Sequence, residues 1–243
     1  MGAVPADLEE LARIPLFEDL EPSVLTAATR QAKVSSLPAR ESLFKEGEKP
    51  EFLHLLLSGS VVLSAAMPEE GKETIIEIVT PHHSFILAAV LTDTPYLMSA
   101  RLLEPARILL LPAAELRRSI ARYPDLALRL LVALASQSRR MVRQLKNLKL
   151  RSTVQRLGFF LLSLAQPGPE GTASVQLPYD KQLIASHLGM TRESLSRALA
   201  ALRDFGVETQ NDRILLKDPA SLERFCGSNS LTDEEEIGLR LPP

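Results

Sequence analysis

The feature that most constrains the fold of this chain is a pair of short helices predicted at residues 180–204 and joined by a glycine turn. Residues 180–187 predict the first helix. Leu188-Gly189-Met190 predicts a tight turn, because glycine tolerates the positive φ that such turns need. Thr191 is placed to cap a second helix that runs to about residue 204. This arrangement is typical of a helix-turn-helix, in which the second helix enters the major groove of DNA.

The second helix has two chemically different faces when its residues are placed about 100° apart. The polar face carries Arg192, Glu193, Ser196 and Arg197, and the opposite face carries Leu195, Ala198, Leu199 and Leu202. Arginine can donate two hydrogen bonds to guanine, and glutamate can accept one from the cytosine amine. We therefore predict that the polar face contacts base edges, while Thr191 at the helix N-terminus meets a phosphate. Lys181 and His187 of the first helix are further DNA-contact candidates. The alternative is a solvated face held by a Glu193–Arg197 ion pair.

The distribution of charge favours a polyanionic partner, although the formal net charge is −2. Residues 126–169 contain no Asp or Glu and eight basic residues: Arg129, Arg139, Arg140, Arg143, Lys146, Lys149, Arg151 and Arg156. The local field, not the total charge, decides where a polyanion docks. A solvated helix face is the simpler alternative for this run taken alone.

A long helix is predicted at residues 123–150, with a seam formed by Leu131, Leu134, Ser138, Met141, Leu145 and Leu148. The steps between these positions alternate 3, 4, 3, 4 and 3, which is the spacing of a heptad seam. We predict that this helix makes a homodimer, whose two-fold symmetry would suit a palindromic site in double-stranded DNA. Packing of the helix on its own domain is the alternative.

The first half of the chain predicts an antiparallel β-roll or barrel, because short β-rich runs alternate with glycine and proline turns. The runs are 51–57, 60–65, 73–79, 99–102 and 106–111. Helices are predicted at 6–12, at 22–31 with Ser23 as the cap, and at 112–122. The second half predicts a helix continuing over 152–165, a strand at 175–177 and a hairpin over 207–216 that turns at Asn211-Asp212.

The predicted fold class is therefore α+β, with four successive parts. Residues 1–122 form the β-roll sensor domain, 123–150 the dimerisation helix and 151–226 a winged helix-turn-helix domain. Residues 227–243 are expected to be a poorly ordered tail.

Composition excludes several classes of function. No apolar run approaches the roughly 20 residues that span a bilayer, and the acidic start is unlike a secretory signal, so we expect a cytoplasmic protein without a membrane partner. The single cysteine, Cys226, cannot supply a disulfide or the four thiolates of an iron–sulfur cluster. No glycine-rich phosphate loop, nucleophilic triad or metal-ligand spacing is present, so we do not expect an enzyme.

Three segments of the chain resemble the CRP/FNR family of bacterial transcription regulators. They are Leu11-Ala-Arg-Ile-Pro-Leu-Phe17, Lys45-Glu-Gly-Glu48 followed by the stretch 53–63, and the stretch 183–197. The resemblance implies a cyclic-nucleotide-binding-like β-roll, a dimerising helix and a winged helix, in an activator that works with RNA polymerase. Glu193 and Arg197 match both the CRP and the FNR types of recognition helix, whereas Arg192 matches the first and Ser196 the second. The half-site preference is therefore open.

The resemblance also bears on the effector. Members that bind cAMP carry a Phe-Gly-Glu motif followed by Arg-Ser, but this chain has Phe85-Ile86-Leu87 and no Arg before Ser99. We therefore expect no cAMP binding, because an unpaired cyclic phosphate in an apolar pocket would cost several kcal/mol.

An apolar effector pocket is predicted instead, formed by Phe85, Ile86, Leu87, Val90, Leu91, Leu97 and Met98. The Asp93-Thr94-Pro95 turn resembles that of the nitric-oxide-responsive denitrification regulators. Haem that senses nitric oxide or carbon monoxide is a candidate cofactor, with His82 or His83 as its axial ligand. Exposed loop histidines are the alternative, and His54 is expected to be structural. A regulator without an effector, or a ligand-binding module that regulates another protein, stays open.

Overall fold

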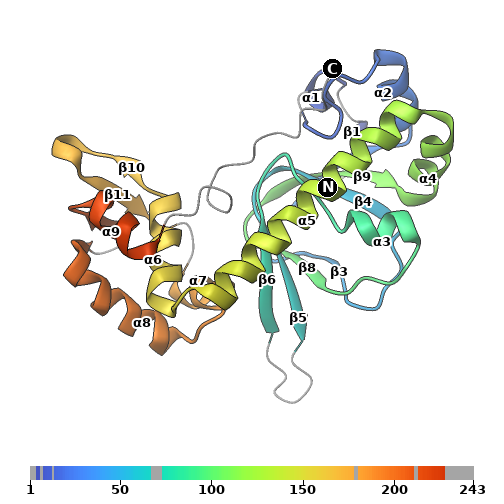
Figure 1. The fold of residues 1–243 in the computed structure, drawn as a ribbon. Helices are drawn as coiled ribbons and strands as arrows, with labels where there is room; N and C mark the ends of the chain where they lie inside the picture. The colour runs from blue at the N-terminus through green and yellow to red at the C-terminus, as the bar shows by residue number, and fades with distance from the viewer. Residues whose placement is uncertain are drawn as a thin grey trace. The chain divides into compact units, whose positions relative to one another are not determined.

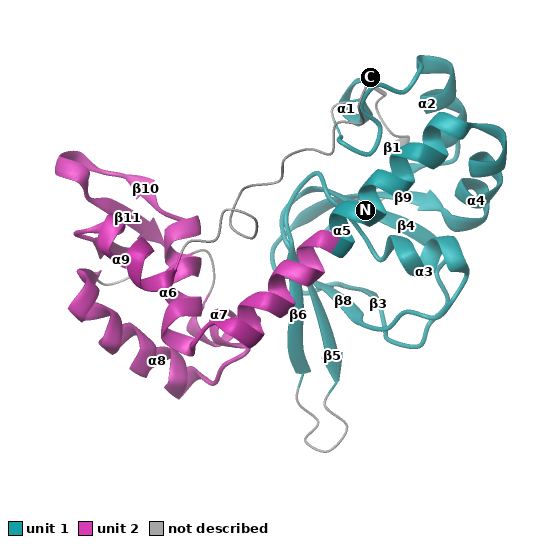
Figure 2. Ribbon diagram, viewed as in Figure 1, with its two compact units in different colours: residues 1–138 teal, residues 139–243 magenta. Residues whose placement is uncertain are grey.

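The structure is a computed structural model that describes residues 4–5, 8–12, 14–66, 73–177, 180–210 and 213–227. The chain divides into two compact units, residues 1–138 and 139–243 (Figure 2). The long helix α5 (Pro124–Leu150) contributes to both units. The predicted α+β class, with a β-rich first part, a long helix and a C-terminal helix-turn-helix, is confirmed (Figure 1). Within the described ranges, no helix is both long and apolar enough to cross a membrane.

The first unit is built on two antiparallel sheets that enclose one apolar core. The first sheet has the order β1-β2-β9-β4-β7, with bounds Val4–Pro5, Lys33–Leu37, Ala106–Pro112, Phe52–Ser58 and Ser84–Phe85. The second has the order β3-β8-β5-β6, with bounds Ser42–Phe44, Ser99–Leu102, Val61–Ala66 and Glu73–Val79. The five predicted strands lie within one residue of β4, β5, β6, β8 and β9.

Strands β2 and β3 were not predicted, because β2 is mostly polar and β3 is only three residues long. In β2 only Val34 is fully buried, and the strand forms by backbone pairing with β9, more than sixty residues away in sequence. Such non-local pairing leaves little trace in a local pattern of hydrophobicity.

The helices of the first unit are α1 (Leu8–Leu11), α2 (Pro22–Thr29), α3 (Leu87–Thr92) and α4 (Ala113–Arg122), followed by the first part of α5. The prediction that Ser23 caps α2 is wrong. Glu21 occupies the cap position without a side-chain hydrogen bond, and Pro22 begins the helix. Proline suits the first helical position because its φ is already helical and it has no N–H to satisfy.

Gly59 makes the turn between β4 and β5 and lies against the start of β9. Its φ is +90°, and a Cβ built there would lie 2.7 Å from the Cβ of Ala106 and 2.8 Å from the carbonyl oxygen of Pro105. Glycine at this turn is therefore required both by the backbone conformation and by the close approach of β9.

The second unit is a winged helix around its own core. Its helices are α6 (Thr153–Ser163), α7 (Lys181–His187), α8 (Arg192–Ala201) and α9 (Pro219–Cys226), with short 3-10 segments η1 (Pro169–Gly171) and η2 (Leu202–Phe205). Its sheet has the order β10-β11-β13-β12, with bounds Gln166–Pro167, Ala173–Gln176, Arg213–Leu216 and Val207–Gln210. The β12–β13 pair is the predicted hairpin. Its predicted turn and the tail from 228 to 243 lie outside the described residues.

The helix predicted to continue over residues 152–165 is instead separated from α5. Ser152 forms a capping box with Gln155: the Gln155 N–H donates to the Ser152 hydroxyl at 3.2 Å, and the Ser152 N–H donates to Gln155 Oε1 at 3.0 Å. A capping box marks a new helix N-terminus. Helix α5 therefore ends at Leu150, and α6 begins at Thr153.

Candidate nucleic-acid interface

Helices α7 and α8 are each fixed at their N-termini by a side-chain cap. The carboxylate of Asp180 accepts a hydrogen bond from the N–H of Leu183 at 2.8 Å. The hydroxyl of Thr191 accepts one from the N–H of Ser194 at 3.2 Å. Between the helices Gly189 has a φ of +63°, the left-handed conformation expected of a glycine in this turn. The predicted first helix and the role of Thr191 as a cap are confirmed, whereas α8 ends at Ala201 and the residues to Phe205 form the 3-10 segment η2.

Helix α8 buries one face and exposes the other, as predicted. Leu195, Ala198 and Leu202 are almost completely buried in the core of the second unit, and Leu199 is half-buried. Arg192, Glu193, Ser196 and Arg197 are exposed. The helix therefore presents two cations, one carboxylate and one hydroxyl to solvent on a rigid support, the arrangement that direct base recognition needs.

The polar face of α8 is organised by hydrogen bonds along the helix. Arg197 donates from Nη2 to the Ser194 hydroxyl at 3.2 Å, and the Ser196 hydroxyl donates to the Arg192 carbonyl at 3.1 Å. The backbone N–H at the helix N-terminus and the Thr191 hydroxyl hold the pKa of Glu193 below its usual value, assisted by the two arginines. Glu193 is thus an ionised acceptor, the form that a cytosine amine requires.

The two candidates on α7 differ in their surroundings. Lys181 is exposed in the first turn of α7. The His187 ring lies edge-on to Phe160, with 6.1 Å between centroids, and its Nδ1 is buried without a hydrogen-bond partner in the described residues. Burial lowers the pKa of His187, so the ring is neutral. The geometry therefore favours Lys181 over His187 as a phosphate contact.

At least three of the eight basic residues in the acid-free run make contacts inside the protein, and the first is Arg129, whose Nη2 lies 2.7 Å from Oδ2 of Asp19. Arg151 donates from Nη2 to the Gly227 carbonyl at 3.0 Å and lies 4.2 Å from the centroid of the Phe159 ring. Arg156 donates to the backbone carbonyls of Leu188 and Gly189. The interpretation of the run as one continuous surface for DNA is therefore too simple, because Arg129 pairs within the first unit and Arg151 and Arg156 hold the winged-helix unit together.

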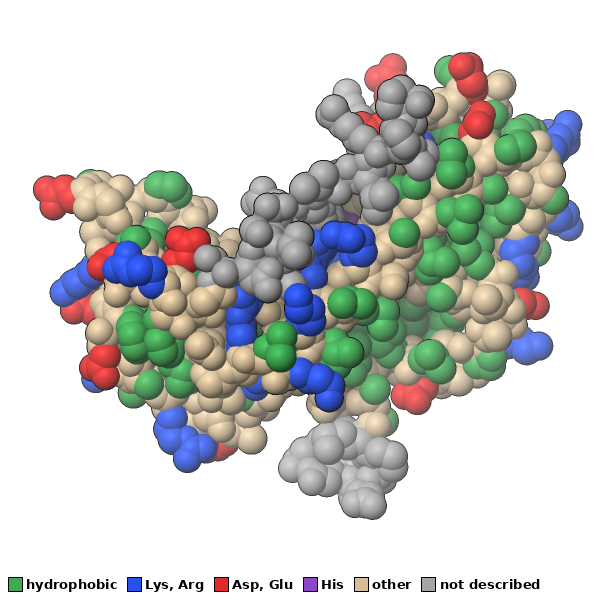
Figure 3. Space-filling model, viewed as in Figure 1, with side chains coloured by type: hydrophobic (Ala, Val, Ile, Leu, Met, Phe, Trp, Pro, Cys, Tyr) green, Lys and Arg blue, Asp and Glu red, His purple; other side chains and the backbone are tan. Residues whose placement is uncertain are grey.

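The predicted seam of α5 is largely apolar and open to solvent in the single chain. Leu131, Met141, Leu145 and Leu148 are 60%, 57%, 52% and 49% exposed. Ser138 is also exposed, whereas Leu134 is half-buried against the core of the first unit. Figure 3 shows hydrophobic side chains beside Lys and Arg along α5. An exposed apolar row of this kind is typical of a surface that a second helix covers.

The residues predicted to form an effector pocket differ widely in their exposure to solvent. Phe85, Leu87 and Val90 are 1%, 0% and 0% exposed and belong to the packed core of the first unit. Ile86 is also buried, Leu91 and Met98 are half-buried, and Leu97 is 82% exposed. Leu97 is therefore not part of an enclosed pocket in this structure, because its side chain projects into solvent from the segment between α3 and β8.

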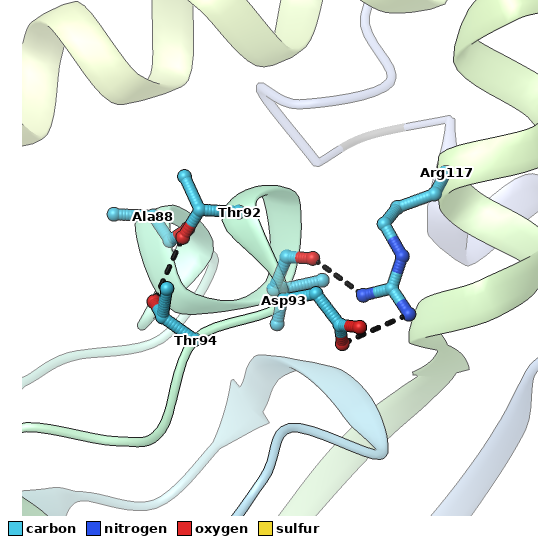
Figure 4. A network of polar contacts seen from close by, with 6 residues as sticks. Ala88, Thr92, Asp93, Thr94 and Arg117 are labelled. Carbon is cyan, nitrogen blue, oxygen red and sulfur yellow. Dashed lines mark hydrogen bonds and ion pairs between the residues drawn. The ribbon is translucent and has the colours of Figure 1, made fainter.

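Helix α3, which begins at the buried Leu87, is held at its C-terminal end by Arg117 of α4 (Figure 4). Arg117 donates from Nη1 to the carbonyl of Val90 at 2.7 Å, and its Nη2 lies 3.1 Å from Oδ1 of Asp93. Asp93 and Ile86, the residues that flank α3, have φ values of +54° and +59°. A β-branched residue with positive φ is unusual, so the buried core around Ile86 maintains a costly backbone conformation before the helix, while Arg117 holds the other end.

The histidines of the first unit occupy three different environments. His82 is exposed in the turn before β7, and the Nδ1 of half-buried His83 lies 3.2 Å from the Pro81 carbonyl oxygen. His54 is buried in β4 among aromatic rings, with centroid distances of 5.2 Å to Phe44 and 5.5 Å to Phe85. The expected structural role of His54 agrees with this burial.

We predict that the buried side chain of His54 makes the protein less stable in mild acid. Burial lowers its pKa to about 4, against a smaller opposing effect of the Phe52 backbone, and its Nδ1 has no hydrogen-bond partner among the described residues. In the unfolded chain the His54 side chain has a pKa near 6.5, so between pH 6.5 and pH 4 it binds a proton that it does not bind in the folded protein. The free energy of unfolding should therefore fall between pH 6.5 and pH 4, by on the order of 3 kcal/mol.

The measurement is urea unfolding of the wild type and of His54→Phe from pH 7 to pH 4. Phenylalanine keeps an aromatic ring at this site but does not titrate, so the variant should lose less stability than the wild type as the pH falls. His187→Phe serves as the control for the second buried histidine. Parallel pH curves for the wild type and His54→Phe would contradict the prediction.

Models of two known domain families match the two halves of the chain. The model for the cyclic nucleotide-binding domain matches residues 34–123, and the model for the Crp-like helix-turn-helix domain matches residues 155–225. The second match contains α7, the glycine turn and α8, and the first contains both sheets apart from β1 and the first residue of β2.

Individual proteins are similar over most of the chain. The CRP-like cAMP-activated global transcriptional regulator of Mycobacterium tuberculosis is 29% identical over 220 residues, 89% of this chain and 98% of that protein. The cAMP-activated global transcriptional regulator CRP of Pasteurella multocida is 30% identical over 176 residues, 70% of this chain and 83% of that protein. A solved structure of a putative cAMP-binding regulatory protein from Silicibacter pomeroyi is 32% identical, with a TM-score of 0.60, and covers 90% of this chain and 100% of that one.

Proposed function

Because this chain belongs to the CRP/FNR family of transcription regulators, we propose that it binds a palindromic DNA site as a dimer under the control of an effector other than cAMP. The DNA-binding part of this proposal is carried by one observation, the exposed face of α8. Arg192, Glu193, Ser196 and Arg197 stand on a capped helix whose opposite face is buried. Helix α8 would enter the major groove, and the wing of β12 and β13 would lie beside it.

The dimeric part of the proposal is supported by the exposed seam of α5. Two copies related by a two-fold axis would bring Met141, Leu145 and Leu148 of each copy against those of the other and remove them from water. The two recognition helices would then meet two half-sites of a palindrome. Activation through contact with RNA polymerase is part of the same proposal.

The argument against cAMP rests on Leu87 and on Met98, the residue directly before Ser99. Two of the similar proteins are named as cAMP-activated, but Leu87 is completely buried and apolar here, and neither residue can pair with a ribose hydroxyl or a phosphate. An anionic phosphate without a partner is costly to bury. We therefore propose that the β-roll senses a different small molecule.

Haem that senses nitric oxide or carbon monoxide is the second candidate, supported by the half-buried position of His83 directly before β7. As they stand, Phe85, Leu87 and Val90 fill the core, so this region would have to open to admit a macrocycle. A Soret band in protein purified with haem, lost in the His82→Ala, His83→Ala double variant, would support this candidate. The absence of a band would exclude it.

The proposed function is tested by mapping bound sites across the genome and then measuring affinity for the recovered palindrome. We expect a two-fold symmetric motif, dimer binding, and an affinity that cAMP does not change. A tenfold or larger increase in affinity with cAMP would overturn the effector proposal. Binding without preference for any sequence would overturn the proposal as a whole. Full affinity of the purified protein, unchanged by cell extract or nitric oxide, would favour a regulator without an effector.

A further inference from the structure

The guanidinium of Arg156, in the first half of α6, donates only to backbone carbonyls. Its Nε lies 3.0 Å from the Leu188 oxygen, and its Nη2 lies 3.3 Å from the Gly189 oxygen. Its Nη1 lies 3.1 Å from the Arg151 oxygen and 3.4 Å from the Leu148 oxygen. One side chain therefore joins the turn of the helix-turn-helix to the end of α5.

The acceptors explain why an arginine stands here without a carboxylate. The carbonyls of Leu148 and Arg151 lie at the C-terminal end of α5, where backbone oxygens lack partners within the helix and the helix dipole favours a cation. In the described part of the chain, no Asp or Glu pairs with Arg156. Its half-buried side chain and its fork of donors suit several carbonyls at once, which a lysine ammonium cannot match.

A second contact brings the same two segments together. A Cβ built on Gly189 would lie 2.9 Å from Cδ2 of Leu148, so the backbone of the turn lies directly against a side chain of α5. Both segments belong to the unit formed by residues 139–243. Leu148 thus takes part in the predicted dimer seam and also contacts the turn that precedes the recognition helix.

We infer that Arg156 is a positioning residue for DNA recognition, which fixes the turn at Leu188 and Gly189, and hence the start of α8, against the C-terminal end of α5. It acts through these backbone groups and not by binding a DNA phosphate. This inference rests on the proposed function, since it concerns how the recognition helix is held.

The test uses the full-length protein with Arg156→Met, which keeps an unbranched stem but removes every donor, and Arg156→Lys, which keeps the charge. The matched control is Lys149→Met, at an exposed basic residue in the last turn of α5. Fluorescence anisotropy measures affinity for the specific palindrome and for scrambled DNA over a series of salt concentrations. Hydrogen exchange of residues 186–191 reports on the turn without DNA.

For Arg156→Met we expect specific affinity to fall by about tenfold or more, because the supporting contacts of a binding site must hold it to about 0.5 Å. Affinity for scrambled DNA and the salt dependence should stay close to those of the wild type, and exchange at the turn should become faster. Arg156→Lys should show the same changes, although smaller. Lys149→Met should leave exchange at the turn unchanged.

Two results would overturn the inference. Equal loss on both DNAs, with the slope of log affinity against log salt reduced by about 0.9, would make Arg156 a phosphate contact. Wild-type affinity and wild-type exchange in both Arg156 variants would show that the contacts position nothing. If the wild type itself binds no DNA specifically, the proposed function fails, while the exchange measurement still decides whether Arg156 holds the turn.

Discussion

Replacing Arg197 by alanine is expected to weaken binding to the specific palindrome by about 1–3 kcal/mol for each half-site. Arg197 is exposed on α8, and its guanidinium is held by the Ser194 hydroxyl at 3.2 Å, so it is presented to DNA in a restricted geometry. Because a dimer places the residue in both half-sites, the loss should reach about 30-fold or more in affinity. Binding to scrambled DNA should change little, since base contacts contribute nothing there.

The measurement is anisotropy with the palindrome and a scrambled duplex at one salt concentration. Arg203→Ala is the matched control, because Arg203 is an exposed arginine in η2, just beyond α8. Arg203→Ala should affect both duplexes to a similar extent or neither. If Arg197→Ala lowers affinity for both duplexes equally, Arg197 contacts phosphate alone and the assignment of base recognition to it is wrong.

The recognition helix could be predicted from the sequence because its determinants are local. The spacing of Leu195, Ala198 and Leu202 defines a buried face at the helical period, and Thr191 and Gly189 mark the cap and the turn. These signals act within one or two turns of helix. They therefore survive in the sequence of a single chain.

The contacts of Arg156 could not be predicted, because its partners are backbone oxygens and two of them come from a distant segment. A carbonyl carries no residue identity, and Leu188 lies 32 positions away along the chain. In sequence, Arg156 is simply one more cation in a basic run. The structure separates it from the exposed cations of α5, and the same holds for Arg151.

Helix α3 was missed for a different reason. The expected apolar pocket treated residues 85–98 as a single lining, but six of these residues form a helix with left-handed backbone on both sides. Ile86 is a β-branched residue, for which propensity disfavours a positive φ, so its packing in the buried core determines its conformation. A backbone conformation that depends on tertiary packing cannot be predicted from the local pattern of hydrophobic and polar residues.

A second large effect is expected from Leu145→Glu in the seam of α5. Leu145 is 52% exposed in the single chain, and Met141 and Leu148, on either side of it in the seam, are similarly exposed. In a two-fold dimer the substitution would place two carboxylates in the apolar seam. Their burial should cost about 3 kcal/mol or more, enough to shift the protein toward monomer at micromolar concentration.

Light scattering after gel filtration measures the mass, and anisotropy measures affinity for the palindrome. Gln144→Glu is the matched control, since it adds the same charge one residue away but outside the seam. The control should remain a dimer with near wild-type affinity, whereas Leu145→Glu should lose most specific binding because a monomer reaches one half-site only. A dimeric Leu145→Glu would mean that the apolar face of α5 is covered by something other than a second α5. Because Leu148 contacts Gly189, loss of the seam should also loosen the turn, so faster exchange at residues 186–191 in Leu145→Glu would connect dimerisation to the placement of α8.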